Sequence, residues 1–146
     1  MLSNIEKCQL LAIVAHRGQQ DKSGTPYIKH LAWVAEHVDT EKEKCVAWLH
    51  DVVEDTDFTI AEIECFGLSD DVVEAVKAIT KKESEEYSDY IKRVKSNNLA
   101  RSVKLQDLRH NMNLWRLGHP PNEVDLRRHE KYKTAFAILS VDGWCV

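Results

Sequence analysis

The segment 48–56, W-L-H-D-V-V-E-D-T, concentrates side chains that can bind a metal ion or carry a proton. One imidazole, His50, precedes the carboxylates of Asp51, Glu54 and Asp55 at the end of an apolar stretch. Residues four apart are neighbours on a helix, so His50 would lie beside Glu54, and Asp51 beside Asp55. Carboxylates at the negative end of a helix repel one another and the helix dipole. The segment therefore has two interpretations: a site for a divalent cation, or a solvated helix end followed by a turn.

Other groups that can bind a metal lie in two distant segments. His30 stands one turn into an apolar helical pattern that follows Pro26. Asp107 forms a polar stripe with Lys104 and Asn111 on a second, otherwise apolar helical segment. Taken singly, such a histidine is more often a packing or surface residue, and such an aspartate is usually solvated.

Taken together, these segments offer two imidazoles and two carboxylates, a mixed nitrogen and oxygen set suited to manganese or a similar divalent first-row metal. Such a set leaves coordination positions open for water and substrate, as a catalytic site requires. The candidate ligands are His30, His50, Asp51 and Asp107. Glu54 would accept a proton from the water, and Asp55 would hold or shuttle it.

Length and charge limit the classes of function. The chain has 146 residues, of which 43% are hydrophobic and 30% charged, as is usual for a globular protein. We expect a single domain over residues 1–146. The net charge of −4 and the pI near 6.0 argue against a nucleic-acid groove. A small phosphorylated nucleotide remains a candidate partner, because a metal ion and a few lysines can reverse the local field.

The cysteines and the N-terminal segment indicate a cytoplasmic protein. Cys8, Cys45, Cys65 and Cys145 form no C-x-x-C pair, and three of them lie within apolar helical patterns. We expect buried, reduced thiols rather than a zinc knuckle or a disulfide framework. The first residues lack the order of a signal peptide, and no apolar run is long enough to span a bilayer.

Helical periodicity dominates the chain, and no segment shows sustained alternation of period two. The sequence predicts an all-α fold of about seven or eight helices. Thr59 and Glu62 form a capping box before a short helix that ends at Gly67, and Ser69 and Ser88 are candidate N-caps. The expected helical segments are 27–38, 41–53, 59–67, 69–79, 88–94, 99–114 and 123–140.

Four motifs in order resemble the HD-domain phosphohydrolases, and within them the alarmone hydrolases of the RelA/SpoT type. They are A-H-R-G-Q (15–19), K-S-G-T-P-Y-I-K-H (22–30), A-W-L-H-D-V-V-E-D-T (47–56) and V-K-L-Q-D-L-R-H-N-M (103–112). The chain is similar in length to the small stand-alone metazoan members. The resemblance covers most of the chain, from residue 15 to about residue 114.

The resemblance implies an all-helical HD fold and a manganese ion bound by the four candidate ligands. It implies that Glu54 and Asp55 are the catalytic acids. It further implies that the 3′-pyrophosphate is cut from ppGpp or pppGpp. By the same resemblance Lys22, Ser23 and Asn111 would contact the substrate.

One position departs from the family pattern. An arginine that packs on the guanine base commonly precedes the lysine, whereas this chain has Asp21. A carboxylate cannot make that stacking contact. Asp21 stays a candidate substrate contact, because it could accept hydrogen bonds from guanine or from the adenine amino group; it could equally point to solvent. Two alternatives therefore stay open: an HD phosphohydrolase of another nucleotide, such as an adenine alarmone or a nucleoside phosphate, and a catalytically silent metal-binding domain.

The remaining histidines have no partner that the sequence reveals. His16 could support the site residues or pack between helices, and we favour packing. The others are treated as structural or solvated: His37, His110, His119 and His129.

Overall fold

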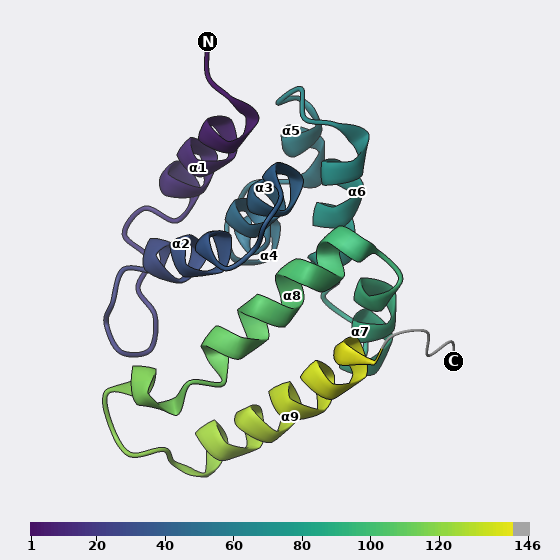
Figure 1. Cartoon of the computed structure of the whole chain (residues 1–146). Coiled ribbons are helices and arrows are strands. Elements are labelled where there is room, and N and C mark those ends of the chain that lie inside the picture. The colour runs from purple at the N-terminus through teal and green to yellow at the C-terminus, as the bar shows by residue number, and fades with distance from the viewer. Residues whose placement is uncertain (142–146) are drawn as a thin grey trace.

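The computed structural model describes residues 1–141, and within them every regular element is helical (Figure 1). The all-α prediction is confirmed. The elements are α1 (Asn4–Ala15), α2 (Ile28–Glu36), α3 (Glu41–Leu49), α4 (Val52–Asp55), α5 (Ile60–Glu64), α6 (Asp70–Ile79), α7 (Tyr87–Lys95), α8 (Asn98–Asn111), the 3-10 helix η1 (Leu114–Leu117) and α9 (Glu123–Ser140). None of the described helices is both long and apolar enough to cross a membrane.

Helix α3 is the centre of the packing. Its last five residues, from Cys45 to Leu49, are all buried, because α1, α2, α6 and α8 pack around it. Helix α8 runs diagonally across the molecule, with α9 beside it (Figure 1). Since α2 and α3 both contact α8, one short region of α8 faces residues from two other helices.

The helix predicted over 41–53 is interrupted. Helix α3 ends at Leu49, and α4 begins at Val52. Asp51 has φ −111° and ψ 0°, in a sparsely populated backbone region where active-site residues often occur. Consecutive side chains on an unbroken helix project about 100° apart. The turn removes that restriction, so that His50 and Asp51 point toward the same place.

Other boundaries differ by a few residues from those predicted. Helix α8 ends at Asn111 rather than near 114, and α7 begins at Tyr87, so Ser88 lies within its first turn. The Thr59–Glu62 capping box is present, and α9 covers the predicted range. Cys8 and Cys45 are buried and free as predicted; Cys65 is exposed at the end of α5, and Cys145 lies outside the described residues.

Arg93 of α7 holds the C-terminal end of α6. Its Nη1 donates to the carbonyl oxygens of Lys77 and Ala78 at 2.8 and 2.9 Å, and its Nη2 donates to that of Thr80 at 3.1 Å. The guanidinium also pairs with Glu85, Nη2 to Oε1 at 2.6 Å. The last carbonyls of a helix have no partner within it, so Arg93 supplies donors that α6 lacks.

We expect Arg93→Ala to lower the free energy of unfolding by about 1–3 kcal/mol, because it leaves partly buried carbonyl groups without donors. Urea denaturation followed by circular dichroism would measure the change. Lys92→Ala, an exposed neighbour on α7, is the control and should change the stability by less than about 0.5 kcal/mol. Equal stability of the Arg93→Ala protein and the parent would contradict this role.

Candidate metal centre

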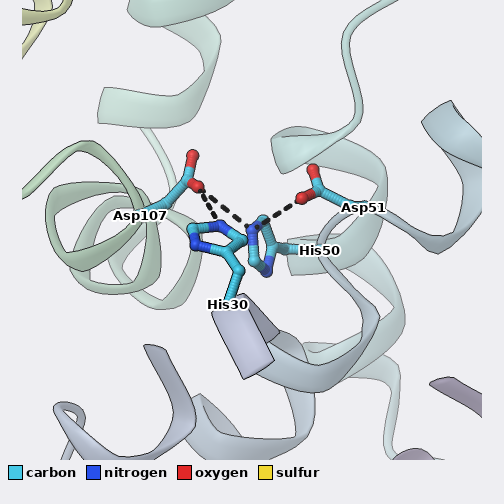
Figure 2. A group of neighbouring side chains, drawn as sticks. All are labelled: His30, His50, Asp51 and Asp107. Carbon is cyan, nitrogen blue, oxygen red and sulfur yellow. Dashed lines mark hydrogen bonds and ion pairs between the residues drawn. The ribbon is translucent and has the colours of Figure 1, made fainter. Parts of the chain in front are cut away.

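Side chains from three separate regions meet in one buried group (Figure 2). His30 comes from α2, His50 and Asp51 from the turn after α3, and Asp107 from α8. Each offers one ligand atom, and these atoms all lie within 4.8 Å of one another. His30 Nε2 is 2.8 Å and His50 Nε2 3.3 Å from Asp107 Oδ1, while His50 Nε2 is 3.1 Å from Asp51 Oδ2.

The orientation of His50 fits a metal ion. Its Nδ1 lies 2.6 Å from the carbonyl oxygen of Ala47, an acceptor that requires a proton on Nδ1. In the neutral ring Nε2 then carries the lone pair, and it is this atom that faces both carboxylates. A metal-binding histidine is usually fixed in this way by a hydrogen bond at its other nitrogen. Two imidazoles and two carboxylates are also the donors that divalent first-row metals accept.

Electrostatics show that the group needs positive charge. Burial disfavours the imidazolium form of His50, but Asp51 and Asp107 outweigh it and raise its pKa well above the ordinary value. Burial likewise opposes ionisation of Asp107, yet Lys104 and His50 hold its pKa well below the ordinary value. Burial alone would raise the pKa of Asp51, but His50 outweighs this effect and lowers the pKa to about 2. The buried carboxylate of Asp107 and the half-buried one of Asp51 are therefore stabilised by neighbouring cations, and a divalent metal would supply further positive charge.

Neighbouring polar groups orient the carboxylates. Lys104 Nζ donates to Asp107 Oδ2 at 2.8 Å, and Asn111 Nδ2 donates to Asp107 Oδ1 at 3.1 Å. The hydroxyl of Tyr27 donates to Asp51 Oδ2. The polar stripe predicted on α8 thus faces the metal centre. Tyr27 was missed by the sequence analysis, although it precedes His30 by three residues and so lies on the same side of α2.

Glu54 and Asp55 lie on α4, at the solvent edge of the group. Glu54 Oε1 accepts a hydrogen bond from the backbone N–H of Lys81 at 2.7 Å. Burial of its carboxyl group raises the pKa of Glu54. Burial, followed by the charges of Asp51 and Glu54, raises the pKa of Asp55 to about 7. Carboxyl groups with raised pKa values can exchange protons near neutrality.

Asp21 is engaged within its own loop. Its Oδ1 accepts hydrogen bonds from the backbone N–H of Ser23 and Thr25, at 2.9 and 3.0 Å, and from the Ser23 hydroxyl at 2.7 Å. Its Oδ2 lies 3.4 Å from Nη2 of Arg116, on η1. These contacts fix the shape of the loop that presents the exposed Lys22. A carboxylate held on both oxygens is poorly placed to accept hydrogen bonds from a base.

Arg116 was also missed, because its partners lie far away in the sequence. Besides Asp21, Nη1 of Arg116 contacts the Asn111 side-chain oxygen at 3.3 Å and the carbonyl oxygen of His110 at 3.0 Å. It therefore links the Lys22 loop to the end of α8. His16 is buried, packs against the Tyr27 ring and has its Nδ1 2.7 Å from Gln19 Oε1.

Comparison with known proteins agrees with the motifs. No family model matches the chain. The bifunctional (p)ppGpp synthase/hydrolase SpoT of Escherichia coli strain K12 is 32% identical over 115 residues, which cover 74% of this chain and 16% of that protein. A Haemophilus influenzae guanosine-3′,5′-bis(diphosphate) 3′-pyrophosphohydrolase is 42% identical over 78 residues, 49% of this chain and 11% of that protein. The chain is a homologue of the SpoT-type (p)ppGpp hydrolases.

The fold of this SpoT homologue is shared with a solved structure. That structure is of a metazoan SpoT orthologue described as hydrolysing ppGpp. It superposes with a TM-score of 0.76 at 24% identity, over 95% of this chain and 86% of the other. The SpoT homologue itself spans about one sixth of the length of the Escherichia coli relative, 16%. The roles of its individual side chains stay predictions.

If the buried group holds a metal, purified protein should contain about one divalent ion per chain. We expect His50→Ala and Asp107→Ala to lose it, because each removes a ligand atom and leaves the opposite charges unbalanced. Metal content after dialysis, measured by inductively coupled plasma mass spectrometry, tests this. His119→Ala, at an exposed position, is the control; full metal content in both ligand variants would rule out the site.

Proposed function

We propose that this SpoT homologue is a metal-dependent phosphohydrolase that removes the 3′-pyrophosphate from ppGpp and pppGpp. The observation that carries the proposal is the buried group of two histidines and two aspartates in a chain related to guanosine-3′,5′-bis(diphosphate) 3′-pyrophosphohydrolases. A solved relative of the same fold is described as acting on ppGpp, which supports the same substrate class.

In the proposed enzyme His30, His50, Asp51 and Asp107 hold the metal, with manganese as the candidate ion. When bound, such an ion activates water and polarises a phosphoryl oxygen. Glu54 is the candidate general base. Because Oε1 already accepts the Lys81 N–H, Oε2 is the oxygen left to take a proton. Asp55, adjacent on α4 and with a pKa of about 7, is the candidate group to receive or return that proton.

Cations gather beside the metal centre despite the negative net charge of the chain. Burial lowers the pKa of Lys131, and the charges of Lys104, Arg128 and Lys81 lower it further, so these side chains share one region. Lys22 is likewise within the field of Arg128. A group of mutually repelling cations is stabilised by a polyanion. This favours a substrate with closely spaced phosphates, such as a pyrophosphate.

The residues that would recognise the nucleotide base suggest a second candidate function. Lys22, Ser23 and Asn111 are the proposed substrate contacts, and Asp21 replaces the arginine that packs on guanine in the family. We infer that contacts to phosphate and metal dominate binding. The enzyme would then cleave guanine alarmones but distinguish them poorly from adenine alarmones. The carboxylate at position 21 favours this second candidate function, the hydrolysis of other nucleotides.

Glu54→Gln tests the catalytic part of the proposal. The amide preserves the shape and can still accept the Lys81 hydrogen bond, but it cannot take up a proton at neutral pH. We expect the metal content to stay at the parent level and kcat for ppGpp to fall by about 10²- to 10⁴-fold. Glu36→Gln, at an exposed position on α2, should keep the parent rate. If the activity of Glu54→Gln stays within a few-fold of that of the parent, Glu54 is not the general base.

Asp21→Arg tests the specificity. The measurement is the ratio of kcat/KM for ppGpp to that for the adenine analogue, because a distorted loop would lower both values together. We expect a ratio near unity in the parent and a shift toward guanine in Asp21→Arg, since a planar cation can stack on the base. Asp21→Asn keeps the acceptor for the loop and should leave the ratio unchanged. A parent that prefers guanine strongly, with no change in Asp21→Arg, would refute this role for position 21.

A further inference from the structure

His30, one of the two histidines of the metal centre, contacts a third histidine, His110 of α8. His30 Nδ1 lies 2.7 Å from His110 Nδ1, 80 residues along the chain. The two rings are within 13° of parallel, with centroids 4.9 Å apart. Rings in face contact keep their atoms roughly 3.5 Å or more apart. A nitrogen–nitrogen distance of 2.7 Å therefore places the rings edge to edge, in the geometry of an N–H···N hydrogen bond.

Packing holds His110 in this plane. The Trp33 ring stacks on His110, with centroids 4.4 Å apart and planes at 16°, and His37 also stacks on Trp33, at 3.7 Å and 14°. His37 Nδ1 in turn lies 2.7 Å from the Trp33 carbonyl oxygen. Both Trp33 and His110 stand three residues beyond a candidate ligand, His30 and Asp107 respectively. The helical spacing therefore presents them to the same side of the centre.

The pair has two proton arrangements. In the first, His110 carries its proton on Nδ1 and donates to His30; His30 Nε2 then carries a proton and donates to Asp107 Oδ1 at 2.8 Å. In the second, His30 carries its proton on Nδ1 and donates to His110 Nδ1, and His30 Nε2 has a free lone pair. Only the second arrangement lets His30 bind a metal ion, because a ligand nitrogen must be unprotonated.

We propose that His110 is a positioning residue that stabilises the metal-binding tautomer of His30 by accepting its Nδ1–H. This rests on the proposed metal-dependent function. His50 has a carbonyl oxygen in the equivalent place, which can only accept. His30 has an imidazole, which can accept or donate. The centre therefore combines one ligand fixed permanently in the binding tautomer with one whose tautomer depends on the proton position of its neighbour.

Two substitutions separate the hydrogen bond from ring packing. His110→Asn places an amide oxygen near the former Nδ1 and keeps the acceptor, while His110→Phe keeps the ring and removes the acceptor. We expect the Mn²⁺ affinity, from competition with a fluorescent chelator, to fall about 10- to 100-fold in His110→Phe. His110→Asn should stay within a few-fold of the parent. His119→Phe is the control for an exposed histidine.

The result that overturns the proposal is an unchanged Mn²⁺ affinity in His110→Phe, or an equal loss in both variants. Should His110→Phe not fold, the parent protein loaded with Zn²⁺ provides the second measurement. Long-range ¹H–¹⁵N spectra of the imidazoles should show the proton on Nδ1 of His30 and on Nε2 of His110; a proton on Nδ1 of His110 would refute the role. Neither measurement uses nucleotide, so a parent that binds metal but cleaves no alarmone would refute only the proposed function.

Discussion

The buried carboxylate of Asp107 is the constraint on which the rest of the site depends. A buried charge is stable only when several partners compensate for its lost hydration. Asp107 has Lys104 and Asn111 on its own helix, at 2.8 and 3.1 Å, and His30 and His50 from α2 and the end of α3. The helical spacing supplies the first two partners. The other two require α8 to pack against α2 and α3, so the charge of one side chain and the packing of three helices depend on each other.

The turn at His50 and Asp51 follows from the same constraint. Both side chains must reach Asp107 or its immediate surroundings, and neighbours on an unbroken helix diverge by about 100°. Ending α3 at Leu49 keeps the buried apolar face of that helix intact, since Val46 and Leu49 are fully buried. Restarting at Val52 places Glu54 and Asp55 at the edge of the centre. The short helix α4 is thus a consequence of directing two adjacent polar residues inward.

Local patterns in the sequence were sufficient for the all-α fold, the capping box at Thr59 and the range of α9, because each depends on residues close together. The turn after Leu49 was missed, since the apolar pattern continues to Val53 while the reason for the turn lies 57 residues away, at Asp107. The contact of Arg116 with Asp21 joins residues 95 apart, and that of His110 with His30 joins residues 80 apart. Helical spacing places His110 on the same side as Asp107, but a periodic pattern does not identify which side chain from another helix it meets.

The net charge of the chain is negative, but cations gather near the metal centre. This local positive charge favours a substrate that carries phosphates. The chain carries −4 overall, yet Lys104 lies 2.8 Å from Asp107, and His50 lies 3.1 Å from Asp51 and 3.3 Å from Asp107. A divalent ion held by this group would add positive charge to the region. Lys131 lies within the fields of Lys104, Arg128 and Lys81, and Lys104 pairs with Asp107. The metal and the lysines would then act together on a substrate with adjacent phosphates, and a single phosphate would use only part of that potential.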